Sequence, residues 1–223
     1  MTVAPPRVSA ICLFVLYACA PGLGQEAARN VWPQEYKSRT PEEMAKQFEE
    51  PSRPVFRYRA AITGLMQLKP GMTAADIGAG SGFLARMIAQ KVGPSGTAIA
   101  TELDAGIVAY MNDRARGEGL ANFSAVIGQP TSTGLQPASL DAAAVVNAYS
   151  SFDRPKEMLQ SIAEAVKPGG LLLIVDVPRT GSGPDATGVE AEDVVAAATE
   201  AGFVLQDESS VVPGHYAIRF RRK

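Results

Sequence analysis

A glycine-rich turn directly after a short apolar stretch constrains the fold of this chain more than any other feature. The stretch reads ADIGAGSGF, from Ala75 to Phe83, and its glycines are Gly78, Gly80 and Gly82. A turn of this kind joins a buried strand to a helix and can cradle a ligand at the carboxyl end of that strand. The turn therefore predicts an α/β domain with a ligand site at one edge of its sheet.

The sequence on both sides of the turn alternates between strand and helix patterns. Helical repeats of apolar residues cover 84–92, 107–115, 158–166 and 194–201. Strands are expected at TAADIGAG (73–80), GTAIATE (96–102), NFSAVIG (122–128), DAAAVVNAY (141–149) and LLLIVDV (171–177), with a closing pair at FVLQDES (203–209) and HYAIRF (215–220). Such alternation with short connections predicts a doubly wound sheet that binds its ligand beyond the carboxyl ends of the strands.

Residues 25–67 are predicted to form a helical extension ahead of this domain. Thr40 is a candidate N-cap and Pro41 a first helical residue, which predicts a short helix on the outside of the domain. A second helix is expected from Val55 to about Leu68. Its residues 56–59 either cover a bound ligand or only pack against the sheet.

Residues 1–24 have the order of a secretory signal peptide. One positive charge precedes the apolar run VSAICLFVLYACA (8–20), and small residues follow up to Gly24. The run is shorter than the roughly 20 residues of a membrane-spanning helix, so no stable membrane span is expected. We expect cleavage after Gly24 and export to the periplasm or the medium; without a working signal the chain would be cytoplasmic.

Both cysteines, Cys12 and Cys19, lie inside this segment, and LYAC resembles a lipobox. Lipidation of Cys19, which would make the protein a lipoprotein, is therefore the alternative to simple cleavage. The remaining chain has one histidine, His215, and no cysteine, so a soft-metal site is not expected. A net charge of −2 without a basic run before the C-terminal RFRRK does not indicate a nucleic-acid partner.

The residues around the glycine turn separate the candidate ligands. The spacing is G-x-G-x-G, whereas dinucleotide sites use G-x-G-x-x-G. Asp76 precedes the turn and would repel a pyrophosphate but attract a cationic ligand. Glu102, at the end of the second strand, is placed to accept both hydroxyls of a ribose. A nucleoside with a cationic tail fits these features, and S-adenosylmethionine is such a molecule.

Four sequence pieces in order also resemble the class I S-adenosylmethionine-dependent methyltransferases. They are LKPGMTAADIGAGSGFLARMIA, TELD, SLDAAAVVNAYSSF and AVKPGGLLLIVD, and the resemblance covers residues 68–223. It implies a Rossmann-like, doubly wound sheet of seven strands whose last strand is antiparallel, in three αβα layers. It also implies S-adenosylmethionine as the cofactor.

The resemblance implies a role for each matching residue. Asp76 and the backbone from Gly78 through Ala79 and Gly80 to Gly82 would hold the methionine part of the cofactor. Glu102 would bind the ribose and Leu103 would pack on the adenine. Gln129 stands where the family usually has an acid that contacts the adenine amino group, and its amide oxygen accepts the same bond. Asn147 and Tyr149 would lie near the transferred methyl group and position the reactants.

The function expected from these features is methyl transfer to a small molecule, because the chain has little room for a separate substrate domain. The export signal opposes this expectation, since S-adenosylmethionine is made in the cytoplasm. The alternative is an exported, non-catalytic protein that binds the nucleoside or S-adenosylmethionine with a methyltransferase-like fold. A NAD-linked oxidoreductase is disfavoured by the glycine spacing and by Asp76. The loop TGSGPDATG (180–188) is either a lid over the site or a connector.

Overall fold

The computed structural model describes residues 39–182 and 186–223. The predicted signal segment, with cleavage after Gly24 or lipidation at Cys19, lies outside the described residues. So do residues 25–38 of the predicted extension and the middle of the loop 180–188. These expectations therefore stay predictions.

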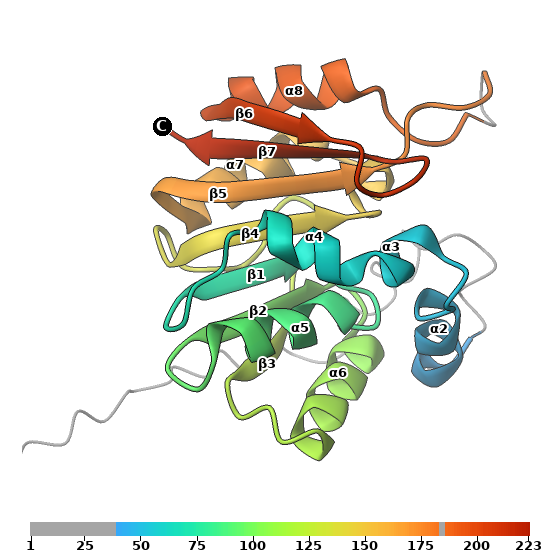
Figure 1. Cartoon of the computed structure of the whole chain (residues 1–223), viewed down its shortest axis with the longest axis vertical. Coiled ribbons are helices and arrows are strands. Elements are labelled where there is room, and N and C mark those ends of the chain that lie inside the picture. The colour runs from blue at the N-terminus through green and yellow to red at the C-terminus, as the bar shows by residue number, and fades with distance from the viewer. Residues whose placement is uncertain (1–38, 183–185) are drawn as a thin grey trace, which may run out of the picture.

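The core of the domain is one seven-stranded sheet with the order β3-β2-β1-β4-β5-β7-β6 (Figure 1). Neighbours from β3 to β5 pair in parallel, while β7 is antiparallel to both β5 and β6. The strands are β1 (Thr73–Ile77), β2 (Thr97–Glu102), β3 (Phe123–Ile127), β4 (Leu140–Val146), β5 (Val166–Asp176), β6 (Phe203–Ser209) and β7 (Tyr216–Arg222). The predicted Rossmann-like sheet with an antiparallel last strand is confirmed.

Helices pack on both faces of the sheet and complete the three layers (Figure 1). The helices α4, α5 and α6 cover one face, and α7 and α8 cover the other. Their bounds are α2 (Pro41–Phe48), α3 (Pro54–Arg57), α4 (Arg59–Leu65), α5 (Phe83–Val92), α6 (Ala105–Gly117), α7 (Pro155–Ala165) and α8 (Ala191–Glu200). The connection between β3 and β4, residues 128–139, contains no helix.

The central strand β4 shows why the sheet is buried on both faces. Its residues alternate between two cores: Ala142 and Ala144 face the α4–α5 side, and Ala143 and Val145 face the α7–α8 side. All four are fully or almost fully buried. A run of apolar residues without polar alternation is the pattern of a parallel strand covered on both faces.

Helix α2 begins as predicted, with Thr40 as its N-cap. The Thr40 hydroxyl accepts the Glu43 N–H at 3.2 Å, and the Glu43 carboxylate accepts the Thr40 N–H at 2.9 Å, which completes a capping box. The helix buries Met44 and Ala45 against the α6 side of the domain. Helix α2 is thus packed onto the domain beside α6.

The single helix expected from Val55 to Leu68 is wrong: α3 and α4 are separated at Tyr58, whose φ and ψ are −96° and 14°. The Arg59 guanidinium donates to the Phe56 carbonyl at 2.7 Å. In an uninterrupted helix that carbonyl would accept the N–H of residue 60. The Arg59 side chain therefore replaces a backbone N–H as the donor to this carbonyl, at the point where the helix is interrupted.

Several strand ends differ from the prediction, including the end of β4 and the start of β5. β4 ends at Val146 rather than at residue 149, because Asn147 has a left-handed φ of 50° and Tyr149–Ser151 forms a 3₁₀ helix (η2). β5 begins at Val166, before the Pro-Gly-Gly segment expected to precede it, and its pairing with β4 is irregular after Leu140. The first difference matters for function, since it sets where residues 147–153 lie.

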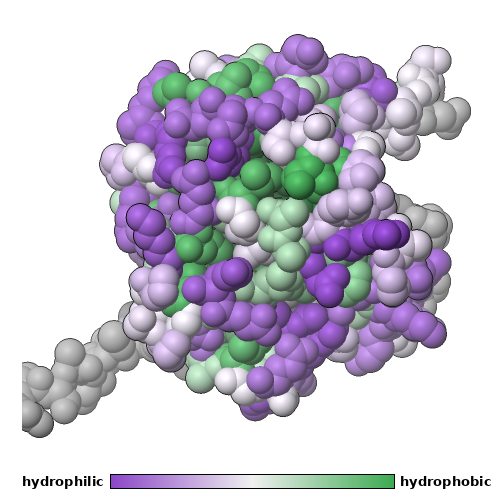
Figure 2. All heavy atoms as spheres, viewed as in Figure 1, coloured by the Kyte–Doolittle hydropathy of each residue, from purple (hydrophilic) through white to green (hydrophobic). Residues whose placement is uncertain are grey.

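The surface in Figure 2 is largely hydrophilic, with hydrophobic residues gathered near the centre of the face shown. Within residues 39–182 and 186–223, no helix has the length and apolar character needed to cross a bilayer. The same residues contain no cluster of three or more histidine, cysteine or acidic side chains arranged to hold a metal ion.

Candidate active site

A cavity of about 350 Å³ lies at the carboxyl ends of β1, β2 and β4. The sheet order reverses between β1 and β4, and ligands of doubly wound sheets bind at this switch point. The volume is within the range of small-molecule sites. The lining combines the glycine turn, the ends of β2 and β4, the segment after β3 and residues 48–55 of the extension.

The glycine turn forms one wall of the cavity with backbone atoms. Gly78, Gly80 and Gly82 have φ of 73°, 54° and 72°, values that side chains disfavour. A Cβ on Gly78 would lie 2.7 Å from the Ala148 Cβ, and one on Gly80 would lie 3.1 Å from the Phe48 ring. Only glycine therefore allows this turn to fit between its neighbours and still line the cavity.

Glu102 joins the second strand to the glycine turn. Its carboxylate accepts the Gly80 N–H at 3.0 Å and the Leu103 N–H at 2.7 Å, and the residue lines the cavity. Burial raises the pKa of Glu102, the two N–H groups lower it, and the charge of Asp104 raises it, with a net upward shift. An ionised carboxylate accepts about four bonds, so two acceptor positions are left for ligand hydroxyls.

Asp76 is buried and is not among the residues that line the cavity, and its expected contact with the ligand stays a prediction. Burial raises its pKa from 3.8 to about 7; the Ala85 N–H, in the first turn of α5, lowers it, and the charge of Glu102 raises it. The carboxyl of Asp76 is thus influenced by the first turn of α5, whose N-cap residue Gly82 has no side chain. Its effect on a ligand would act through the turn and through charge.

The raised pKa of Asp76 predicts a pH-dependent stability. The folded protein holds this proton more tightly than the unfolded chain, so the stability it confers at low pH is lost as the pH rises through about 7. The unfolding free energy of the wild type, relative to Asp76→Asn, should fall by about 2 kcal/mol between about pH 5 and pH 8. Denaturant unfolding of both proteins measures this difference, and a flat difference contradicts the shift.

Asn147 and Tyr149 are neighbours in the sequence, but their side chains lie in different parts of the structure. Asn147 lines the cavity, and its side-chain oxygen is buried without a hydrogen-bond partner among the described residues. Its N–H donates to the Val175 carbonyl at 2.8 Å, which fixes its backbone to β5. The Tyr149 ring turns into the α7–α8 core and packs edge-on against Phe152, with ring centroids 5.9 Å apart. Tyr149 does not line the cavity.

The other predicted residues fall into two groups. Ala79, Leu103 and Gln129 line the cavity beside Gly78 and Gly80, whereas Gly82 does not. The Cβ position of Gly82 instead faces the Met111 sulfur at 2.7 Å, so this glycine lets α6 approach the turn. The ligand-binding roles of these residues stay predictions.

Several lining residues were not expected from the sequence. The extension supplies Phe48, Arg53 and Val55, while the predicted residues 56–59 are not part of the lining. Phe56 lies behind the lining and packs its ring against that of the lining residue Phe83, with the ring centroids 5.5 Å apart. Beyond β4, the segment after Asn147 contributes Ala148, Ser151, Phe152 and Asp153. Ala148, Ser151 and Phe152 lie within the family piece SLDAAAVVNAYSSF without having been assigned a role, and the lining residues of the extension belong to no such piece.

Comparison with known proteins indicates the family that this domain resembles. Residues 74–170 match the family described as a methyltransferase domain. The ubiquinone/menaquinone biosynthesis C-methyltransferase UbiE of Legionella pneumophila (strain Lens) is 31% identical over 113 residues, which are 50% of this chain and 45% of that protein. The matched part of the chain thus spans about half the length of this relative.

Solved structures show the same architecture. A SAM-dependent methyltransferase from Aquifex aeolicus superposes with a TM-score of 0.71 at 21% identity, covering 83% of this chain and 100% of that one. The [4+2]-cyclase SpnF superposes with a TM-score of 0.65 at 18% identity, covering 74% and 80%. At these identities the likeness concerns the fold alone.

The sheet order, the glycine turn and the sequence match together support a class I S-adenosylmethionine-dependent methyltransferase domain. About half of the chain is similar in sequence to methyltransferases of the UbiE type.

Proposed function

We propose that the chain binds S-adenosylmethionine in the cavity at the carboxyl ends of β1, β2 and β4 and transfers its methyl group to a small molecule. The observation that carries the proposal is the junction of Glu102 with the glycine turn: one buried carboxylate both holds the Gly80 backbone and faces the cavity. This arrangement suits a nucleoside whose ribose meets the carboxylate and whose tail runs along the turn.

The residues around the cavity fit this ligand on several sides. Leu103 gives an apolar contact for a base, and Gln129 offers an amide beside it. The unpartnered side-chain oxygen of Asn147 is an acceptor for a polar group at the end of β4. S-adenosylmethionine, when bound, supplies an activated methyl group.

The chain's part in the reaction is alignment. Direct displacement needs the nucleophile, the methyl carbon and the leaving sulfur in line, and groups held in place lower the barrier by removing the entropy cost of this alignment. The backbone of the glycine turn and the fixed backbone of Asn147 are such groups. Phe48, Val55 and Phe152 add apolar side chains to the lining of the same space.

Titration calorimetry of the full chain with S-adenosylmethionine and S-adenosylhomocysteine tests the binding. We expect micromolar dissociation constants, or about 8 kcal/mol of binding free energy. The absence of binding heat for both ligands, checked by a thermal shift assay, contradicts the proposal. A screen of small acceptors with labelled methyl donor then tests transfer.

A second candidate is an exported, non-catalytic binding protein with the same fold. One observation favours it: the apolar run at residues 8–20, which has the order of a secretory signal peptide. Binding without methyl transfer to any acceptor in the screen supports this candidate. The intact mass of the chain recovered from expressing cells tests the export part, since cleavage after Gly24 removes residues 1–24.

A further inference from the structure

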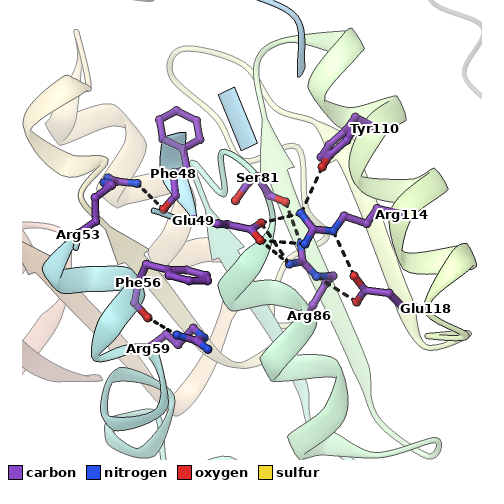
Figure 3. Close-up of polar contacts among 10 residues, drawn as sticks. All are labelled: Phe48, Glu49, Arg53, Phe56, Arg59, Ser81, Arg86, Tyr110, Arg114 and Glu118. Carbon is purple, nitrogen blue, oxygen red and sulfur yellow. Dashed lines mark hydrogen bonds and ion pairs between the residues drawn. The ribbon is translucent and has the colours of Figure 1, made fainter. Parts of the chain in front are cut away.

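Glu49, directly after α2, lies at the centre of a compact ionic cluster (Figure 3). Its carboxylate accepts two bonds from Arg114, at 2.7 Å to Oε1 and 2.8 Å to Oε2. The Nη2 of Arg86 lies 3.2 and 3.3 Å from the same two oxygens. One carboxylate of the N-terminal extension therefore binds arginines of both α5 and α6. We call Glu49, Arg86, Arg114 and Glu118 the ionic cluster.

Glu118 completes the ionic cluster from the other side. It accepts the Nε of Arg86 and the Nε of Arg114, each at 3.1 Å. The two acids and two arginines balance in charge. The side chains of Glu49 and Arg86 are only 14% and 11% exposed, so solvent screens their attraction weakly.

The arginines outweigh the effect of burial on Glu49. Burial alone would raise the pKa of Glu49, but the bonds and charges of Arg114 and Arg86 hold it below its usual value. Glu49 is therefore ionised at neutral pH. Removal of its charge would leave the largely buried guanidinium of Arg86 and the partly buried one of Arg114 short of a partner, which is costly for this arrangement.

The ionic cluster connects directly to the proposed cofactor site. Arg86 also donates to the Ser81 carbonyl at 3.1 Å, and Ser81 belongs to the glycine turn and lines the cavity. On the other side, Glu49 follows Phe48, whose ring lies over Gly80. Arg53 donates to the Phe48 carbonyl at 2.8 Å and lines the same cavity. The two cavity walls are thus joined through Arg86 and Glu49.

We propose that the ionic cluster holds residues 48–55 closed over the bound cofactor and thereby sets how long the cofactor stays in the site. Glu49 and Arg86 are positioning residues in this role, because they act through Phe48 and Ser81 and do not themselves react. The inference rests on the proposed function, since it needs a ligand in the cavity.

The dissociation rate of S-adenosylhomocysteine from the full-length chain, followed by a stopped-flow chase with excess competitor, tests the inference. Glu49→Gln keeps the shape of the side chain and removes its charge. We expect its dissociation rate to rise about tenfold while the association rate changes by less than about threefold, because a weakened closure mainly speeds ligand escape.

Two further variants sharpen the experiment. Glu50→Gln removes a neighbouring exposed carboxylate that is outside the ionic cluster, and its rates should match the wild type. Arg114→Gln retains the pair of Glu49 with Arg86, so it should raise the dissociation rate less than Glu49→Gln. The double variant should fall short of the product of the two single effects, as expected for residues that share one interaction.

The outcomes separate the possible roles of the ionic cluster. If Glu49→Gln lowers the melting temperature of the ligand-free chain but leaves the dissociation rate within about twofold, the ionic cluster is only structural and the inference is overturned. A wild-type chain that binds neither ligand overturns the proposed function and the inference with it. Binding by the wild type with unchanged kinetics in Glu49→Gln overturns the inference alone.

Discussion

Replacement of Glu102 by alanine is expected to weaken S-adenosylmethionine binding about 100-fold, or ~2.7 kcal/mol. The carboxylate holds the Gly80 and Leu103 N–H groups and faces the cavity, so its loss would both loosen the turn and remove the proposed ribose acceptor. Charge-assisted bonds of this kind are the strong ones in proteins. Titration calorimetry of the variant beside the wild type measures the change.

Glu102→Gln and Glu164→Gln complete this experiment. The first retains one acceptor oxygen but places an amide NH₂ against a backbone N–H, so we expect an intermediate loss of affinity. The second alters an exposed glutamate on α7, away from the cavity, and should leave the affinity unchanged. A loss below about threefold for Glu102→Ala contradicts the proposed role of this residue.

Replacement of Phe203 by alanine should lower the unfolding free energy by about 3–5 kcal/mol. Phe203 begins β6, is completely buried, and packs its ring 6.4 Å from that of Phe220 on the neighbouring strand β7. The cavity left by the ring lies in the core that supports α7 and α8. Urea unfolding followed by circular dichroism measures the difference.

Val204, the next residue of the same strand, is the matched control for this variant. Its side chain is 43% exposed, so Val204→Ala should cost less than about 1 kcal/mol. Equal losses for both variants would contradict the assignment of Phe203 to the core and point to a general weakening of β6.

The sheet and the glycine turn were predictable because their signals are local. The apolar runs alternate with helical repeats, and the G-x-G-x-G spacing follows a strand directly. Glu102 was also found from the sequence, since β1 and β2 are parallel neighbours whose carboxyl ends meet at the same edge. The structure then brings its carboxylate to Gly80, as adjacency in the sheet requires.

The parts that sequence reasoning missed depend on contacts between distant segments. Phe48 lies over Gly80 because α2 packs against the α6 side of the domain through Met44. No spacing of residues in the sequence predicts this contact. Asp76 lies outside the cavity lining, and the Ala85 N–H in the first turn of α5 is among the groups that act on the pKa of its carboxyl. Tyr149 lies outside the cavity lining, because β4 ends before the left-handed Asn147 and Tyr149 begins a 3₁₀ helix.

The helix-free connection between β3 and β4 has a consequence for how such a site can diversify. Residues 128–132 supply Gly128, Gln129, Pro130 and Ser132 to the cavity but belong to no helix or strand that the core depends on. Loops of this kind accept substitutions and length changes more readily than packed elements do. In the proposed binding mode, in which Gln129 contacts the base, preference for that base can therefore evolve in this loop while the glycine turn and the sheet stay as they are.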